Sequence, residues 1–151
     1  MNLATPVTGP ESLLRNLADF RFELRRFLHF SECAALQEGL QPQQHQLLLQ
    51  VAGAAPGTPV TIAYTAERLG LKHNSAVELV GRSESEGFLT RTVDETDKRR
   101  VILCVTRKGK QVLGRLSGNH AQELNELAPR LAATLERIRL HAQDDIRTEG
   151  R

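Results

Sequence analysis

Residues 71–107 constrain the fold of this chain more than any other stretch, because helix and strand signals follow one another there within a few residues. They read LKHNSAVELVGRSESEGFLTRTVDETDKRRVILCVTR. A helix that opens with polar residues ends at Gly87, since glycine commonly closes a helix. Two β-rich runs follow at 88–93 and 100–105, and the charged segment 94–99 joins them as a hairpin loop. Helix, strand, charged loop and strand together indicate a surface that touches a polyanion.

The charge of the chain supports this interpretation only through its distribution. The sequence has 20 Lys and Arg against 18 Asp and Glu, a net charge of +2. So small a sum carries little information about partners. Between residues 72 and 110, however, Lys and Arg outnumber Asp and Glu, and the excess lies in the hairpin loop and its flanks.

Length and composition bound the remaining possibilities. A chain of 151 residues suits one domain, or a small module with dimerising arms, without help from disulfides or metal. Cys33 and Cys104 lie far apart and form no metal-ligand spacing with each other or with histidine. The sequence contains no signal-peptide pattern and no apolar run long enough for a membrane span. We therefore expect a soluble, cytoplasmic protein in a reducing compartment, without a metal, another cofactor or a membrane partner.

Both ends of the chain predict long helices. Residues 1–10 and 147–151 lack an apolar period and are expected to be flexible. Apolar residues recur every three or four positions across 11–38. A second such stripe runs through 107–146, and because Pro129 interrupts it we predict two helices, 107–127 and 129–146. One small domain cannot bury these stripes, so both segments are predicted to form a dimer interface.

The segment 40–106 carries the outline of a helix-turn-helix. A helix follows Gly39 with Pro42 in its first turn, and Val60 is expected in a short strand. Thr61 is a predicted N-cap for a helix that ends at Gly70. A second helix follows at once, so a glycine-containing turn joins two short helices. The predicted inner face of the second helix consists of Ala76, Val77, Leu79 and Val80.

This order of motifs resembles the MarR family of bacterial regulators, winged helix-turn-helix proteins that dimerise through their terminal helices. The resemblance rests on TIAYTAERLGL, LVGR, SEGFLTR, DKRR and LCVTRKG, in that order, and on the helix start at Thr106 and Gly109. It implies a mostly α fold with a small β-hairpin wing, in which 40–106 binds DNA and the long terminal helices dimerise. The implied function is a homodimeric, ligand-responsive transcriptional repressor that binds a pseudo-palindromic operator in double-stranded DNA.

Two positions depart from the family pattern. Thr65 stands in the first helix of the helix-turn-helix, and Ser83 late in the second, where the family usually has leucine. We hypothesise that both face one small core. There they either form hydrogen bonds or leave space that Tyr64 or Phe88 partly fills.

The resemblance implies a second helix in the major groove and a wing in the minor groove. In the wing, it implies that Arg99 enters or follows the minor groove while Asp97 orients it, and a narrow A·T-rich groove favours an inserted arginine. Arg91, Arg107 and Lys108 are expected to contact phosphate. The candidate DNA-binding residues are Lys72, His73, Asn74, Ser75, Glu78, Arg82, Arg91, Asp97, Lys98, Arg99, Arg100 and Arg107.

Three residues of the second helix have an alternative role. Asn74 or Ser75 suits an N-cap as well as a base contact. Glu78 suits the acceptor for a cytosine amino group, yet it also follows Ser75 at the spacing of a capping box. An acid at this position repels phosphate in either role, so modest general affinity for DNA is expected.

Sensing leaves a weaker trace in the sequence. The resemblance implies a small aromatic or phenolic effector, and the candidate pocket residues are Phe20, Phe27, His29, Phe30, His45 and His120. A phenylalanine at helical spacing is equally consistent with core packing. Cys33 is a candidate redox thiol if it is exposed and its pKa is lowered. Cys104, in an apolar strand, is expected to be inert packing.

An enzymatic function has no support among the motifs. The sequence lacks GxSxG, a P-loop, HExxH and a Rossmann glycine pattern, so we expect no enzyme. A second interpretation is a helical interaction protein that keeps the fold without sequence-specific DNA binding. Its support is Glu78 and the low net charge.

Overall fold

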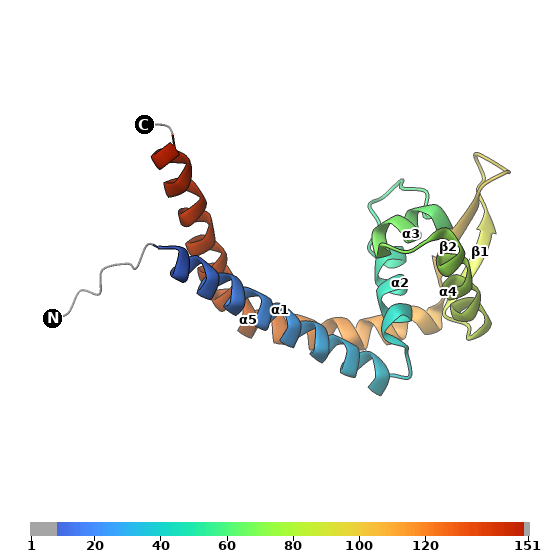
Figure 1. Cartoon of the computed structure of the whole chain (residues 1–151). Helices are drawn as coiled ribbons and strands as arrows, with labels where there is room; N and C mark the ends of the chain where they lie inside the picture. The colour runs from blue at the N-terminus through green and yellow to red at the C-terminus, as the bar shows by residue number, and fades with distance from the viewer. Residues whose placement is uncertain (1–8, 150–151) are drawn as a thin grey trace. The chain divides into compact units, whose positions relative to one another are not determined.

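The computed structural model describes residues 9–149, with side chains described as far as residue 143. The described elements are α1 (Pro10–Gln37), α2 (Pro42–Ala52), α3 (Ile62–Leu69), α4 (His73–Ser85), β1 (Leu89–Val93), β2 (Val101–Val105) and α5 (Arg107–Glu149), labelled in Figure 1. The strands form one two-stranded antiparallel sheet. The predicted class, mostly helical with a β-hairpin, is therefore confirmed. Of the termini predicted to be flexible, residues 1–8 and 150–151 lie outside the described residues.

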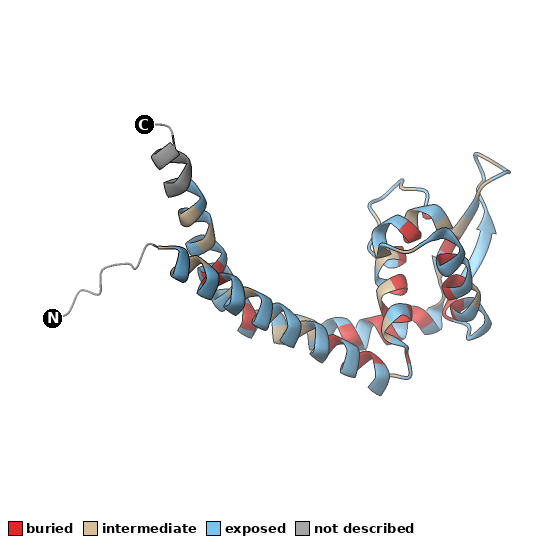
Figure 2. Ribbon diagram, in the orientation of Figure 1, coloured by how far each residue is buried: buried red, intermediate tan, exposed pale blue. Residues whose placement is uncertain are grey.

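The chain divides into two compact units. The winged-helix unit is Ser31–Asn119, and the terminal-helix unit combines the chain up to Phe30 with the chain from His120 onward. The winged-helix unit is wider than the predicted 40–106, because the end of α1 and the start of α5 contribute side chains to its core. Figure 2 shows buried positions on α2, α3, α4 and the first turns of α5. Its core consists of Ala34, Ala35, Leu40, Leu47, Leu48, Val51, Val60, Leu79, Val80, Phe88, Leu89, Leu103, Val112, Leu113 and Leu116.

The helix-turn-helix has the capping chemistry that its sequence predicts. The Thr61 hydroxyl oxygen accepts a hydrogen bond from the Tyr64 backbone N–H at 3.1 Å, which caps α3. Gly70 closes α3 in the left-handed region at φ 63°, where a side chain would be strained. Val60 is not in a strand, although its carbonyl accepts from the Leu103 N–H at 2.8 Å. That single bond ties the start of the helix-turn-helix to the wing.

Thr65 and Ser83 are both completely buried, as hypothesised. The Thr65 hydroxyl donates to the Ile62 carbonyl and the Ser83 hydroxyl to the Leu79 carbonyl, each at 2.9 Å. Buried hydroxyls require such partners. The hydrogen-bonding alternative therefore holds, with each hydroxyl satisfied by its own helix.

The wing joins α5 through a close contact between a turn and a helix start. The Thr106 hydroxyl donates to the Gly87 carbonyl at 2.6 Å and accepts from the Gly109 N–H at 3.1 Å. Thr106 thus caps α5, as predicted, and binds the residue that ends α4. A Cβ on Gly109 would lie 2.5 Å from the Phe88 carbonyl oxygen and 2.6 Å from Val105 Cγ1. Glycine is required here by close approach.

The prediction of two C-terminal helices is wrong, because α5 continues through Pro129. Proline removes one backbone donor from a helix, but this loss is local. Leu127 and Thr134 on either side are buried, and packing of this kind maintains the helix across a missing hydrogen bond.

Polar contacts connect α1 and α5 in the terminal-helix unit. Arg137 Nε donates to Asn16 Oδ1 at 3.1 Å, and Arg130 lies 3.4 Å from the Glu23 carboxylate. Around these contacts several large apolar side chains are exposed: Leu14, Leu17, Phe22, Leu24, Leu28, Leu124, Leu135 and Leu140. Within residues 9–149, no helix combines the length and apolar character needed to cross a membrane.

Candidate DNA interface

Helix α4 presents a mixed face to solvent. Its buried positions are Ala76, Leu79, Val80 and Ser83, a stripe that repeats every three or four residues. Val77 falls at the edge of that stripe and is 36% exposed, so the prediction that it belongs to the inner face is wrong. The exposed positions are Lys72, which precedes the helix, and His73, Asn74, Ser75, Val77, Glu78, Arg82, Glu84 and Ser85.

The predicted caps of α4 are also wrong. The helix begins at His73, its N-cap is Lys72, and no side chain makes a capping hydrogen bond there. Ser75 therefore lies inside the first turn, too late to serve as the N-cap of a box with Glu78. Asn74, Ser75 and Glu78 thus have no capping role. The capping box is therefore excluded for Glu78, and its contact with a base stays a prediction.

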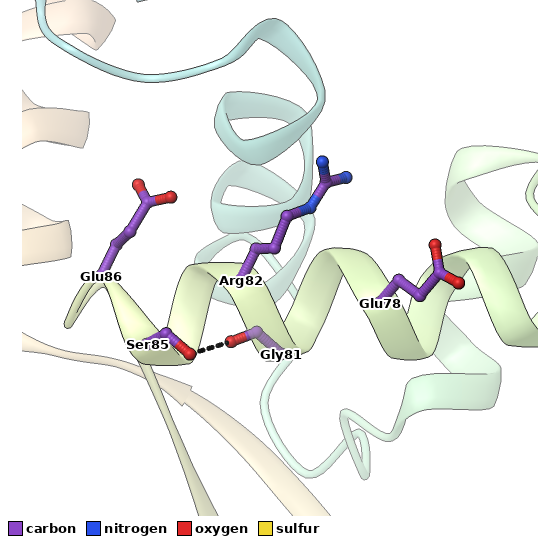
Figure 3. A pocket seen from close by; sticks show the side chains of 5 residues that line it. All are labelled: Glu78, Gly81, Arg82, Ser85 and Glu86. Atoms are coloured by element: carbon purple, nitrogen blue, oxygen red, sulfur yellow. Dashed lines mark hydrogen bonds between the residues drawn. The ribbon is translucent and has the colours of Figure 1, made fainter.

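An open hollow of about 540 Å³ follows the second half of α4 (Figure 3). Gly81 is one of its lining residues, and the Ser85 hydroxyl donates to the Gly81 carbonyl at 2.9 Å. The side chains of Glu78, Arg82 and Glu86 project from the same side of the helix in this view. Two carboxylates and one guanidinium therefore border the hollow.

The wing carries its exposed cation at the turn between the strands. The Arg99 side chain is 95% exposed, and its Nε lies 3.6 Å from Asp97 Oδ1. The same Asp97 oxygen accepts from the Arg99 backbone N–H at 3.1 Å. Asp97 thus holds both the main chain and the side chain of Arg99. The role in a minor groove that the resemblance implies for this pair stays a prediction.

The neighbouring arginine has a different role. Arg100 Nε lies 3.3 Å from the Asp94 carboxylate. The Thr96 backbone N–H and hydroxyl donate to that carboxylate and, together with Arg100, hold the pKa of Asp94 below its ordinary value. Asp94 therefore stays ionised and keeps Arg100 within the loop. Lys98 and Arg99 remain exposed.

Among the other basic candidates, two have partners within the protein and one is exposed at a helix start. Arg91 Nε lies 2.9 Å from the Glu84 carboxylate, so β1 is tied to α4 by an ion pair. Lys108 Nζ donates to the Glu86 carbonyl at 2.7 Å and lies 4.4 Å from the centre of the Phe88 ring. Both cations thus have partners within the winged-helix unit. Arg107 is exposed at the start of α5.

The candidate pocket residues come together only in part. The His120 ring contacts Phe27 and Phe30 edge-on, with centroids 5.8 and 5.5 Å apart. His29 is exposed and Phe20 is half-buried in the same unit. His45 is buried in the winged-helix unit.

Both cysteines are exposed. Cys33 therefore meets the condition of exposure that was set for a redox thiol. The expectation that Cys104 is packing is wrong, because side chains alternate along a strand and it is Leu103 that points inward. Among the described residues, no group of His, Cys, Asp and Glu is able to hold a metal ion.

Two short helices around a glycine turn, followed by a two-stranded hairpin with an exposed arginine, define a winged helix-turn-helix, a class of DNA-binding module. Residues 38–100 match the profile of the MarR family. Over residues 38–100, the chain is therefore similar to the DNA-binding domain of the MarR family of transcriptional regulators.

Two relatives in sequence are regulators. The chain is 28% identical over 116 residues to a proposed transcriptional regulatory protein for the hcr operon of Thauera aromatica, covering 74% of this chain and 68% of that one. It is 27% identical over 109 residues to the transcriptional activatory protein BadR of Rhodopseudomonas palustris, covering 64% and 62%. The chain thus spans about two thirds of each relative's length.

Two solved structures show the same fold. The MepR F27L mutant of S. aureus, bound to an oligodeoxyribonucleotide, has a TM-score of 0.61 at 16% identity and covers 85% of this chain and 94% of its own. CouR of Rhodococcus jostii, bound to p-coumaroyl-CoA, has a TM-score of 0.59 at 21% identity and covers 75% and 83%.

Proposed function

We propose that this protein is a homodimeric regulator that binds a specific operator in double-stranded DNA. In this proposal α4 enters the major groove and the wing enters the adjacent minor groove. The observation that carries it is that the winged-helix unit exposes polar side chains on α4 and an arginine in the wing. Asn74, Ser75 and Glu78 have no capping role on an exposed helix face, and Arg99 is extended at the tip of the wing. Side chains of these types form hydrogen bonds with base edges or enter a narrow minor groove.

Dimerisation is supported by the terminal-helix unit. In the part of this unit whose side chains are described, Phe22 and seven leucines are exposed, and apolar side chains that gather on a surface mark protein interfaces. A second copy of the chain is the partner that we propose. Two-fold symmetry would then require a pseudo-palindromic operator with half-sites about 10 bp apart.

The proposed regulation is repression that a ligand relieves. A ligand shifts the protein between geometries only if it binds one of them more tightly. The effector that we propose is a small aromatic or phenolic compound, which would contact the rings of Phe27, Phe30 and His120. CouR of Rhodococcus jostii, which has the same fold, was solved with p-coumaroyl-CoA bound. BadR, by its name an activator, represents the opposite sign of regulation.

A mobility shift at two salt concentrations tests DNA binding. Because bound cations displace counterions from phosphate, the affinity for DNA is expected to fall more than about tenfold between roughly 50 and 200 mM salt. A specific fragment should survive competition by unrelated DNA at the lower concentration. If no complex forms at either concentration, the alternative of an interaction protein that does not bind DNA is favoured instead.

A further inference from the structure

Gly81 lies in the interior of α4, the proposed recognition helix, and the fold does not require a glycine at this position. Its φ is not in the left-handed region, so the backbone conformation suits any residue. A Cβ added there would meet only the Arg91 Nη2 atom, at 4.0 Å, which is an ordinary contact. Glycine is among the least favourable residues in a helix interior. The chain thus keeps a weak helix former where alanine would fit.

The residues around Gly81 indicate which chemical group could occupy the space beside its backbone. It lines the hollow together with Glu78, Arg82, Ser85 and Glu86. The two carboxylates repel a phosphate group, so a sugar–phosphate backbone is an unsuitable occupant. A carboxylate accepts hydrogen bonds and a guanidinium donates them. The two side by side therefore suit a group that presents an N–H donor next to hydrogen-bond acceptors. Glu78 and Arg82 are four residues apart and are neighbours on one helix face.

A C·G base pair has this pattern in the major groove. Cytosine presents its N4 amino donor, and guanine presents the O6 and N7 acceptors beside it. We propose that the hollow receives the major-groove edge of one C·G pair. This assignment rests on the proposed DNA binding. Glu78 accepts from cytosine N4, Arg82 donates to guanine O6 and N7, and Gly81 lets the base edge approach the helix backbone. Gly81 is thereby a specificity-determining position.

Selection of bound DNA from a random pool tests this assignment with three full-length proteins. The wild type should enrich a motif with C·G at one position of each half-site. Glu78→Gln should change the preferred base at that position from C to A, because glutamine pairs with the N6 and N7 edge of adenine. Gly81→Ala should melt at a higher temperature yet bind the wild-type motif about tenfold more weakly.

The control is Gly114→Ala, an exposed helix glycine in α5 with nothing within 4 Å of an added Cβ. It should melt at the wild-type temperature or above it, without a change in DNA affinity. If the wild type enriches a motif but either Glu78→Gln selects the same base or Gly81→Ala binds as well as the wild type, the C·G assignment is overturned and DNA binding stands. If the wild type enriches no motif, the proposed function fails and this assignment fails with it.

Discussion

Arg99→Ala is expected to lower the affinity for operator DNA roughly ten- to hundredfold, the loss of about 1–3 kcal/mol for a specific arginine contact. The melting temperature should not change, since the Arg99 side chain is 95% exposed and its ion pair with Asp97 lies at the surface. Mobility shift and thermal unfolding of the same preparation measure the two quantities. The effect would come from the DNA contact itself.

Comparison with Glu78→Ala makes this prediction sharper. Removing Glu78 would remove the proposed base contact but also a charge that repels phosphate, so the two effects should partly cancel. Its loss of affinity should be smaller than that of Arg99→Ala. Arg21→Ala, on an exposed position of α1 outside the winged-helix unit, controls for the change in net charge. A larger loss for Glu78→Ala than for Arg99→Ala would refute this division between wing and helix.

Gly109→Ala is expected to lower the free energy of unfolding by about 1–3 kcal/mol, the usual effect of overpacking. The added Cβ would overlap the Phe88 carbonyl oxygen, and a backbone atom cannot move aside as a flexible side chain can. The same overlap separates the helix start from the Gly87 turn, so the wing is displaced and affinity for DNA falls too. Urea denaturation and mobility shift measure the two consequences.

Gly114→Ala is the matched control on the same helix. An added Cβ there meets nothing within 4 Å, so this variant should be as stable as the wild type or more stable, by up to about 1 kcal/mol. Equal stability of the Gly109→Ala and Gly114→Ala variants would contradict the proposed role of close approach at the start of α5.

The sequence was most informative where a local signal has a local cause. Thr61, Gly70 and Thr106 were predicted as helix boundaries, and each makes the backbone contact or adopts the conformation that defines such a boundary. The hairpin followed from two β-rich runs around a charged loop, and its register pairs Val93 with Val101. These features depend on neighbours within a few residues, which the sequence displays directly.

The errors arose where the outcome depends on tertiary packing or on a shift of one or two residues. Pro129 stays within α5 although its local preference is to end a helix. The start of α4 at His73 moved Ser75 out of the capping position. Val77 and Cys104 are apolar residues that face solvent because the helical and strand periods direct their neighbours inward. The apolar character of a residue alone did not show whether its side chain is buried or faces solvent.

The candidate interface was predictable as a set of residues but not as an arrangement. The sequence singled out Arg99, Asp97, Glu78 and Arg82. It did not show that Arg91 is paired with Glu84, because the two lie on different elements. Nor did it show that Gly81 lines a hollow, because a glycine within a helical sequence indicates only a weak helix former. The first of these facts requires the packing of β1 against α4.

Selection of DNA from a random pool by the wild-type protein tests the central claim most directly. A dimeric winged helix-turn-helix should enrich an inverted repeat whose half-sites are centred about 10 bp apart. The repeat would report sequence-specific binding and two-fold symmetry in one measurement. Recovery of unrelated sequences without a common motif, or of a single half-site without its inverted copy, would contradict this account.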